Sequence, residues 1–151
     1  MPSEASTIHA SAVLVGTKAV LIRGPSSSGK SRLAWNLVQA AEQGALPFAR
    51  LVADDRVHVE VHAGRLLVRP APALAGMIEI YGLGICQVAF EAVAAVGLVV
   101  DLAAADAARL PPVTAGNTAI SGVILPRVAI ATGMEVLPMV LASLKSIPAG
   151  N

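Results

Sequence analysis

Residues 24–31 have the composition and spacing of a phosphate-binding loop. Gly24, Pro25, Ser26, Ser27, Ser28, Gly29, Lys30 and Ser31 fill every fixed position of the pattern G-x-x-x-x-G-K-[S/T]. The two glycines let the backbone curl, so that successive N–H groups point at phosphate oxygens, and the lysine adds a positive charge. The last serine supplies a hydroxyl for Mg²⁺. The sequence therefore predicts a nucleotide-binding site at this loop.

The segments on either side of the loop have the character that such a site needs. Residues 18–23 form a short apolar run typical of a strand, and from Ser31 apolar residues recur at helical spacing as far as Gly44. A helix N-terminus at the loop would add its partial positive charge to the site. Gly16-Thr17 separates residues 12–15 from the loop strand, which predicts a two-residue hairpin and an antiparallel neighbour for that strand.

Three acid-bearing segments compete to complete the site. Asp54-Asp55 follow an apolar run, Glu79 lies inside the apolar segment 77–85, and Asp101 ends another short strand. Phosphoryl transfer needs Mg²⁺, positioning and a group that orients or deprotonates the acceptor hydroxyl, and spacing alone does not choose among the three. Glu79 calls for a partner, because a buried carboxylate without one is costly. Two adjacent carboxylates near phosphate repel unless a metal or a shared proton relieves them.

Further hydrophobic patterns predict the elements that would surround the site. Alternating residues over 57–62, a turn at Ala63-Gly64 and a return over 65–69 predict a second hairpin. His58, Glu60 and His62 share one face of that hairpin, a pattern more typical of a solvated surface than of a metal site.

The C-terminal half is expected to add two helices and an edge strand. Residues 87–96 are Ala-rich and are predicted to be helical, and residues 121–131 alternate as an edge strand interrupted by Pro126. A last helix is predicted over 134–146. Thr132 and Glu135 have capping-box spacing ahead of it, and Pro138 should either kink this helix or mark its true first turn.

Length and composition restrict the class of protein and of partner. Residues 1–151 suffice for one domain, and a net charge of +1 without a basic stripe argues against nucleic acid or a membrane surface as a partner. Charged residues interrupt the apolar stretch 82–108, which argues against a membrane span. Hydrophobic residues make up 55% of the chain, which favours coverage of some surface in a homo-oligomer.

Cysteine usage and the N-terminal residues indicate a cytoplasmic protein. Cys86 is the single cysteine, so the chain has no internal disulfide, as is usual in a reducing compartment. The first fifteen residues carry an acid early and lack the basic start of a secretory signal.

Three segments, in this order along the chain, resemble the catalytic domain of HPr kinase/phosphorylase. They are residues 24–31 (GPSSSGKS), 51–57 (LVADDRV) and 78–85 (IEIYGLGI). That family has a phosphate loop (P-loop), an L-[IV]-A-D-D-x-V strand end and an E-I-R-G-[LV]-G-I signature. The resemblance is close over about residues 8 to 90 and looser beyond. The family's separate N-terminal domain has no counterpart, so we expect the truncated form found in some proteobacteria.

The resemblance implies both a fold and an activity. The fold is a compact α/β P-loop domain with a mixed sheet, similar to phosphoenolpyruvate carboxykinase, and the family assembles as hexamers. The activity is that of a serine kinase, which uses ATP and Mg²⁺ to phosphorylate the phosphocarrier protein HPr or its nitrogen-branch relative. The full-length family also reverses this reaction by phosphorolysis.

Roles for individual residues follow from the same resemblance. Lys30 would hold the β- and γ-phosphates, and Ser31 and Glu79 would serve Mg²⁺. Asp54 would accept the serine proton in the kinase direction, and Asp55 would lie beside it. In phosphorolysis the same carboxyl group would protonate the departing serine oxygen.

A histidine completes this set of implied site residues. His9 matches the family's histidine in the strand ahead of the loop, and it would tune the pair of aspartates.

Two departures from the family pattern favour the kinase direction over phosphorolysis. Tyr81 stands where the family has arginine, and residues 124–131 do not match the family's Arg- and Gly-rich segment, with Arg127 as the only cation there.

Two other functions are compatible with a phosphate loop. A small-molecule P-loop kinase is disfavoured, because arginine is too sparse after residue 70 for a lid-like segment. A non-catalytic ATP-binding regulatory module is the other alternative.

Overall fold

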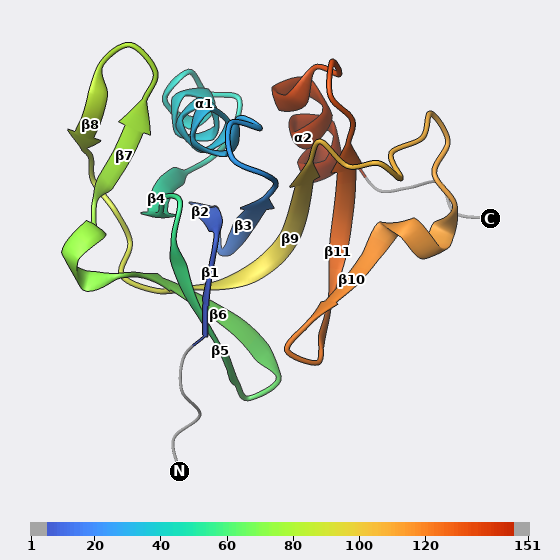
Figure 1. Ribbon diagram of the computed structural model, residues 1–151, viewed down its shortest axis with the longest axis horizontal. Coiled ribbons are helices and arrows are strands. Elements are labelled where there is room, and N and C mark those ends of the chain that lie inside the picture. Colours follow the sequence, from blue (N-terminus) through green and yellow to red (C-terminus); the bar gives the residue numbers. More distant parts are fainter. Residues whose placement is uncertain (1–5, 147–151) are drawn as a thin grey trace.

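The computed structural model describes residues 6–146 (Figure 1). Residues 1–5 and 147–151 lie outside the described part of the chain. The first of these ranges begins the N-terminal segment that is expected not to be a secretory signal. The main sheet has the strand order β1 (Ser6–Ile8), β5 (Val57–His62), β6 (Arg65–Pro70), β9 (Ala94–Leu102), β3 (Lys18–Arg23), β2 (Ala10–Val15) and β4 (Ala49–Ala53). β11 (Val123–Ile130) also joins β9 and pairs with β10 (Asn117–Ile120).

The remaining elements lie outside this sheet. Helices α1 (Lys30–Glu42) and α2 (Val136–Lys145) lie on the same side of it, and β7 (Met77–Ile80) and β8 (Gly84–Gln87) form a separate hairpin beside α1 (Figure 1). Short 3₁₀ turns occupy Pro72–Leu74 and Val113–Gly116. No helix within residues 6–146 is long and apolar enough to cross a membrane.

Strand β9 joins the two parts of the main sheet. Its first residues pair antiparallel with β6, and its last residues pair parallel with β3 on one side and β11 on the other. The predicted hairpin of β2 and β3 forms with Val15 opposite Lys18, so the loop strand has one antiparallel and one parallel neighbour. The expected α/β domain with a mixed sheet is therefore confirmed.

The central strands are buried on both faces, which explains their nearly continuous apolar runs. In β3, Val20 and Ile22 pack in the core beneath the helices, whereas Ala19 and Leu21 pack in a second core on the opposite face. Leu33, Ala34 and Leu37 of α1 are buried in the first core, as the helical spacing predicts.

The second predicted hairpin also forms as expected. β5 pairs with β6 through the turn Ala63-Gly64, and both turn residues have positive φ, as a type I′ turn requires. Glu60 forms an ion pair with Arg69, and no group of three metal-ligating side chains occurs within residues 6–146. His62 is exposed, and His58 and Glu60 are partly exposed, which agrees with a solvated surface on this face of the hairpin.

The helix predicted over residues 87–96 is wrong. The chain leaves β8 at Gln87, Phe90 forms a bridge with Leu51, and β9 begins at Ala94. Alanine has the highest helix propensity, but such propensities are small compared with tertiary contacts, and here pairing with the sheet outweighs that preference. Ala94 and Val96 are buried in the second core as strand residues.

Two details of the C-terminal elements also differ from expectation. β11 runs through Pro126 without interruption; Pro126 lies opposite Asn117 in the half of the strand that pairs with β10. The capping box of Thr132 and Glu135 does not form, because Glu135 is the N-cap and its side chain makes no capping hydrogen bond. Pro138 lies in the first turn of α2, which is the second of the two roles expected for it.

Candidate functional site

The loop between β3 and α1 has glycine at two positions where a side chain would clash or would strain the backbone. A Cβ on Gly24 would lie 2.5 Å from the Ser28 Oγ and 3.1 Å from the Leu102 Cβ. Gly29 is the N-cap of α1 and has a left-handed φ of 101°. Both fixed glycines of the motif are thus explained by the backbone path.

Three further features of the loop suit an anion. Buried Lys30 donates from its Nζ to the carbonyl oxygens of Gly24 (2.9 Å) and Pro25 (3.0 Å), which leaves one of its three donor positions for a phosphate. The Ser28 Oγ is buried without a hydrogen-bond partner among the described residues, a state that a phosphate oxygen would relieve. Helix α1 begins at Lys30 with no acidic residue in its first turn, so the partial positive charge of its N-terminus is available to an anion.

A β-bulge in β4 aims Asp54 at the loop. The register between β2 and β4 shifts from Ala12↔Ala53 to Val13↔Leu51, so Val52 is an extra residue. Val52 and Ala53 both pack in the second core, and the next residue, Asp54, therefore faces α1. Bulges commonly redirect a side chain in this way.

Asp54 is held by hydrogen bonds from three directions. It is only 7% exposed. The Ser31 Oγ donates to both carboxylate oxygens (2.7 and 2.9 Å), the Ser11 Oγ donates to Oδ1 (2.7 Å), and the Glu79 backbone N–H donates to Oδ2 (3.0 Å). Asp54 therefore lies directly beneath the hydroxyl that the loop motif assigns to Mg²⁺.

Asp55 points the opposite way, toward open space. Its φ of 66° marks a sharp turn after β4, and its carboxylate accepts a hydrogen bond of 2.5 Å from the His9 Nε2. The Asp55 side chain is 70% exposed. The adjacent acids are thus separated by the backbone turn, one buried under Ser31 and the other reaching a histidine.

Glu79 is exposed, which corrects the expectation of a buried carboxylate. The apolar segment 77–85 folds into the β7–β8 hairpin rather than one buried strand, and only Ile78 of its first strand is fully buried. The Glu79 side chain instead lines the same cavity as Ser31.

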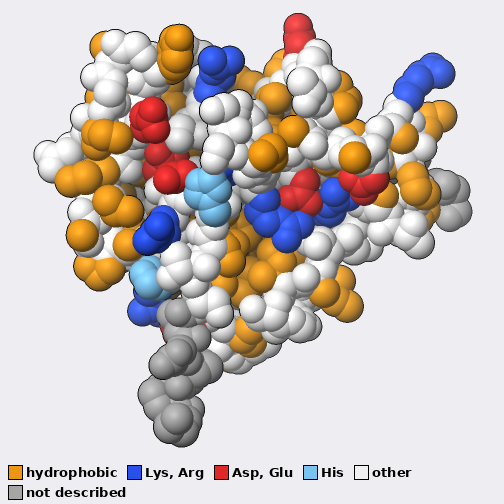
Figure 2. All heavy atoms as spheres, in the orientation of Figure 1, with side chains coloured by type: hydrophobic (Ala, Val, Ile, Leu, Met, Phe, Trp, Pro, Cys, Tyr) orange, Lys and Arg blue, Asp and Glu red, His pale blue; other side chains and the backbone are white. Residues whose placement is uncertain are grey.

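An open cavity of about 690 Å³ lies against the loop. Such a volume is within the range of small-molecule sites. Its lining consists of His9, Ser26, Ser27, Gly29, Lys30, Ser31, Arg32, Trp35, Asp55, Glu79, Ile80 and Tyr81. Asp54 is not among these residues. Figure 2 shows acidic, basic and histidine side chains gathered across the middle of one face of the molecule, with hydrophobic side chains on both flanks.

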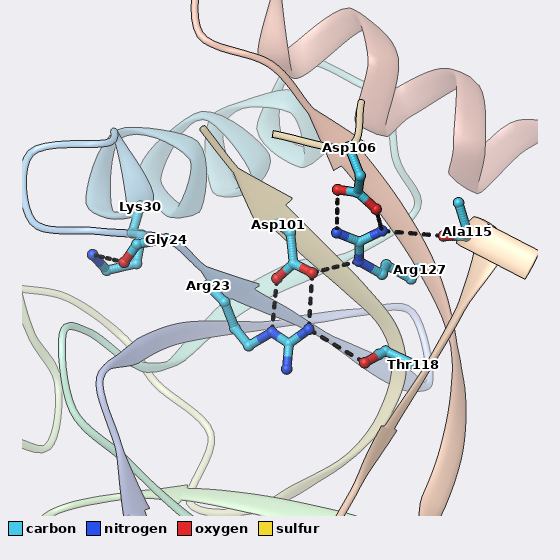
Figure 3. Close-up of polar contacts among 8 residues, drawn as sticks. All are labelled: Arg23, Gly24, Lys30, Asp101, Asp106, Ala115, Thr118 and Arg127. Carbon is cyan, nitrogen blue, oxygen red and sulfur yellow. Dashed lines mark hydrogen bonds and ion pairs between the residues drawn. The ribbon is translucent and has the colours of Figure 1, made fainter. Parts of the chain in front are cut away.

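Asp101 belongs to a separate ion-pair network, not to the cavity. Its carboxylate accepts two hydrogen bonds from Arg23 (2.7 and 2.8 Å) and one from Arg127 (2.5 Å). Arg127 also binds Asp106 and the carbonyl oxygen of Ala115 (Figure 3). The geometry therefore answers the question that spacing left open: of the three acid-bearing segments, Asp54-Asp55 and Glu79 meet at the loop, and Asp101 does not.

This network shifts the pKa values of its members. Burial alone would raise the pKa of Asp101, but hydrogen bonds and charges from Arg23 and Arg127 outweigh it and lower the pKa. Hydrogen bonding to Arg127 likewise lowers the pKa of Asp106, and the two carboxylates raise that of Arg127. Arg127, the sole cation in its segment, is therefore committed to structure.

The donor set at the loop fits a magnesium ion. The Ser31 hydroxyl, the Asp54 carboxylate and the Glu79 carboxylate of the adjacent hairpin are all oxygen groups, which Mg²⁺ prefers. Mg²⁺ usually takes only one or two carboxylates, with water and substrate phosphates completing its coordination. The residues present are therefore sufficient for a metal bound together with a nucleotide.

Sequence reasoning missed Ser11, which touches both members of the aspartate pair. Besides its bond to Asp54, the Ser11 Oγ accepts a hydrogen bond from the Asp55 backbone N–H (3.2 Å). The one feature of the sequence that could have indicated Ser11 is its position as a hydroxyl residue inside the apolar run of β2.

Comparison with known proteins shows the family of this chain. Residues 2–136 match the family described as HPr Serine kinase C-terminal domain. The HPr kinase/phosphorylase of Streptococcus thermophilus is 39% identical over 87 residues, which cover 57% of this chain and 26% of that protein. That of Levilactobacillus brevis is 38% identical over the same shares. The chain thus spans about a quarter of the length of these curated relatives.

A solved structure has a similar fold. The structure described as the HPr(Ser) kinase/phosphatase from Coxiella burnetii superposes with a TM-score of 0.72 at 23% sequence identity. The match covers 93% of this chain and 88% of that one.

Proposed function

Because the chain belongs to the HPr serine kinase C-terminal domain family, we propose that it transfers the γ-phosphoryl group of ATP to a serine hydroxyl of an HPr-type phosphocarrier protein. One observation carries this proposal: the Ser31 hydroxyl rests on Asp54 beneath the phosphate loop, while Asp55 and His9 face the same cavity. A loop alone would suit any nucleotide-binding protein. The second acid, open to the cavity, supplies a group that can act on an acceptor hydroxyl.

The loop and Lys30 would hold the nucleotide, and Ser31, Asp54 and Glu79 would hold Mg²⁺. When bound, the metal would neutralise charge that develops on the phosphoryl oxygens. The role of the chain would be to present backbone N–H groups of the loop and the Lys30 ammonium around the phosphates.

Asp55 is better placed than Asp54 to accept the serine proton. Asp54 is buried and already accepts hydrogen bonds from two hydroxyls and a backbone N–H. Asp55 lines the cavity, and His9 orients its carboxylate. We therefore assign Asp54 to the metal and Asp55 with His9 to the proton, which moves the proton-accepting role from Asp54, where the family resemblance places it, to Asp55.

Phosphorolysis is a secondary activity in this proposal. Tyr81 lines the cavity where the resemblance places an arginine, and Arg127 is occupied by Asp101 and Asp106. The cavity therefore offers fewer cations for inorganic phosphate as a co-substrate.

The finer statements on fold and assembly remain part of the proposal. The antiparallel β2 between β3 and β4 supports a phosphoenolpyruvate carboxykinase type of P-loop domain. Exposed apolar residues on the β7–β8 hairpin, among them Leu83 and Ile85, support a homo-oligomer, by resemblance a hexamer. We place this activity in the cytoplasm, where a phosphocarrier and ATP would meet.

Intact-mass measurement tests the proposed activity. Purified protein is incubated with ATP, Mg²⁺ and candidate HPr-type phosphocarriers, and a known active relative serves as control. We expect one added phosphoryl group on a serine of the phosphocarrier, dependent on both ATP and Mg²⁺. Unmodified phosphocarriers, alongside labelling by the relative, would refute the kinase proposal.

A further inference from the structure

Ser11 is a fully buried hydroxyl at the junction of the two aspartates. Its Oγ donates to the Asp54 Oδ1 at 2.7 Å and accepts from the Asp55 backbone N–H at 3.2 Å. A buried hydroxyl costs free energy unless it is hydrogen-bonded. Here both its donor and its acceptor functions are used, and both partners belong to the candidate site.

Strand pairing places this hydroxyl opposite Asp54. Ala12 pairs with Ala53 across β2 and β4, so one further step along the register sets Ser11 opposite Asp54. Ser11 also lies on the same face of β2 as Val13, which packs in the core beneath α1. An apolar side chain would be the ordinary choice at this position. The hydroxyl instead meets the carboxylate that the β4 bulge turns onto this face.

The two serines that donate to Asp54 differ in what else they can bind. Ser31 lines the cavity and can turn its oxygen toward a cation there. Ser11 is fully buried, and its contacts lie on the aspartates. When Ser31 leaves Asp54 for a cation, the side-chain donor left on that carboxylate is Ser11.

We infer that Ser11 is a positioning residue that holds the Asp54 carboxylate in place for a divalent cation bound with a nucleotide. This inference rests on the proposed function in one respect, namely that the loop binds a Mg²⁺-nucleotide. Groups that orient a metal-binding carboxylate commonly change metal affinity by about 10- to 100-fold when they are removed.

The inference separates two kinds of nucleotide binding. ADP without metal would contact the loop and Lys30, which Ser11 does not touch. Mg²⁺-ADP would also depend on the position of Asp54. Ser11→Ala should therefore weaken Mg²⁺-ADP binding about tenfold, and should leave ADP binding in EDTA within about twofold of wild type.

Titration calorimetry with ADP, in Mg²⁺ and in EDTA, makes this comparison on the full chain. Thr7→Val is the matched control, because the Thr7 hydroxyl contacts His58 across the pairing of β1 with β5 and touches neither aspartate. Ser11→Cys is a second variant of similar volume with a weaker donor, and should weaken Mg²⁺-ADP binding in the same direction. Melting curves without ligand report whether each variant is folded.

A double-mutant cycle tests whether Ser11 acts through Asp54. In Asp54→Asn the carboxylate is already lost, so adding Ser11→Ala should cause no further loss of Mg²⁺-ADP affinity. Equal weakening with and without Mg²⁺, wild-type binding in both Ser11 variants, or additive losses in the double variant would each overturn the inference.

The same titration distinguishes failure of the inference from failure of the proposed function. A wild-type protein whose ADP binding does not respond to Mg²⁺ would overturn both. A wild-type protein that binds Mg²⁺-ADP but labels no phosphocarrier would refute only the kinase proposal, because the Ser11 comparison uses no protein substrate.

Discussion

The Ser31 hydroxyl donates to both carboxylate oxygens of Asp54, at 2.7 and 2.9 Å, although the two residues lie 23 positions apart in the chain. The contact joins the first turn of α1 to the end of β4. In P-loop enzymes, the loop serine or threonine and a strand-end aspartate together hold Mg²⁺. Asp54 therefore belongs with the phosphates, although it does not line the cavity itself.

Replacement of Asp54 should uncouple metal binding from nucleotide binding. We expect Asp54→Asn to reduce phosphocarrier labelling at least about a hundredfold and to abolish the gain in ADP affinity that Mg²⁺ provides. Metal-free ADP binding should persist. Glu60→Gln is the control, since it makes the same change on a hairpin outside the cavity lining. A non-catalytic nucleotide sensor would lack turnover in the wild type too and would respond little to this substitution.

Replacement of Asp55 should have a different signature. Asp55→Asn removes a proton acceptor, and such groups contribute about 10²- to 10⁴-fold to rate. We expect kcat to fall by that order while Mg²⁺-ATP affinity stays near wild type, as measured by single-turnover labelling and calorimetry. The fold should be unaffected, because the pair with His9 is exposed. If Asp55→Asn retains turnover and Asp54→Asn alone loses it, Asp54 is the proton acceptor.

Lys30 should be required for nucleotide affinity. Hydrogen bonds to charged groups contribute about 1.5–3 kcal/mol, so we expect Lys30→Met to weaken ATP binding about 10- to 100-fold in calorimetry. Lys145→Met removes the same charge from the last turn of α2 and should bind ATP like wild type. Equal ATP affinity in the two variants would contradict the placement of phosphate at the loop.

The local elements of the site could be predicted from the sequence, whereas its long-range pairings could not. The loop, both hairpins and α1 follow from turn residues and periodicity within short windows. The strand at Ala94 depends instead on pairing with Leu67 and Val68, which outweighs the helix preference of an Ala-rich segment. Local pattern carries no information about such a partner.

Long-range pairing also decides which of the acids lies at the phosphate loop. Asp54 and Asp101 both follow apolar runs, and spacing does not separate them. The structure separates them through the one-residue bulge in β4, which turns Asp54 toward Ser31. Arg23 separates the two aspartates as well, because it binds the carboxylate of Asp101 although the two residues lie 78 positions apart in the chain.

Asp101 should stabilise the fold in a pH-dependent way. Its side chain is 15% exposed and joins Arg23 to Arg127. Because its pKa is lower in the folded than in the unfolded chain, its contribution is complete above its ordinary value of 3.8 and is lost as pH falls through the lowered pKa. We expect Asp101→Asn to reduce the free energy of unfolding at pH 7 by about 2 kcal/mol, somewhat below the range for fully buried pairs.

Urea unfolding at several pH values tests this dependence. The difference between wild type and Asp101→Asn should shrink as pH falls below about 4. Asp106→Asn is the control, since it removes a more exposed carboxylate from the same Arg127 and should have a smaller effect at pH 7. A difference between wild type and Asp101→Asn that stays constant down to pH 2 would show that the charge of Asp101 is not responsible.

Tyr81 should limit the reverse reaction. It lines the cavity beside Glu79 and is 94% exposed, so a longer polar side chain can replace it without disturbing a core. Tyr81→Arg would add a planar guanidinium, which binds phosphate through paired hydrogen bonds. With phosphoserine phosphocarrier and inorganic phosphate as substrates, we expect phosphorolysis to rise about tenfold, mainly through a lower KM for phosphate, since one charge-assisted hydrogen bond contributes about 1.5–3 kcal/mol.

Leu83→Arg is the control for net charge, because it adds the same charge two positions away, on a residue outside the cavity lining. If both variants raise phosphorolysis equally, net charge is responsible; if neither does, residue 81 does not control the direction of the reaction.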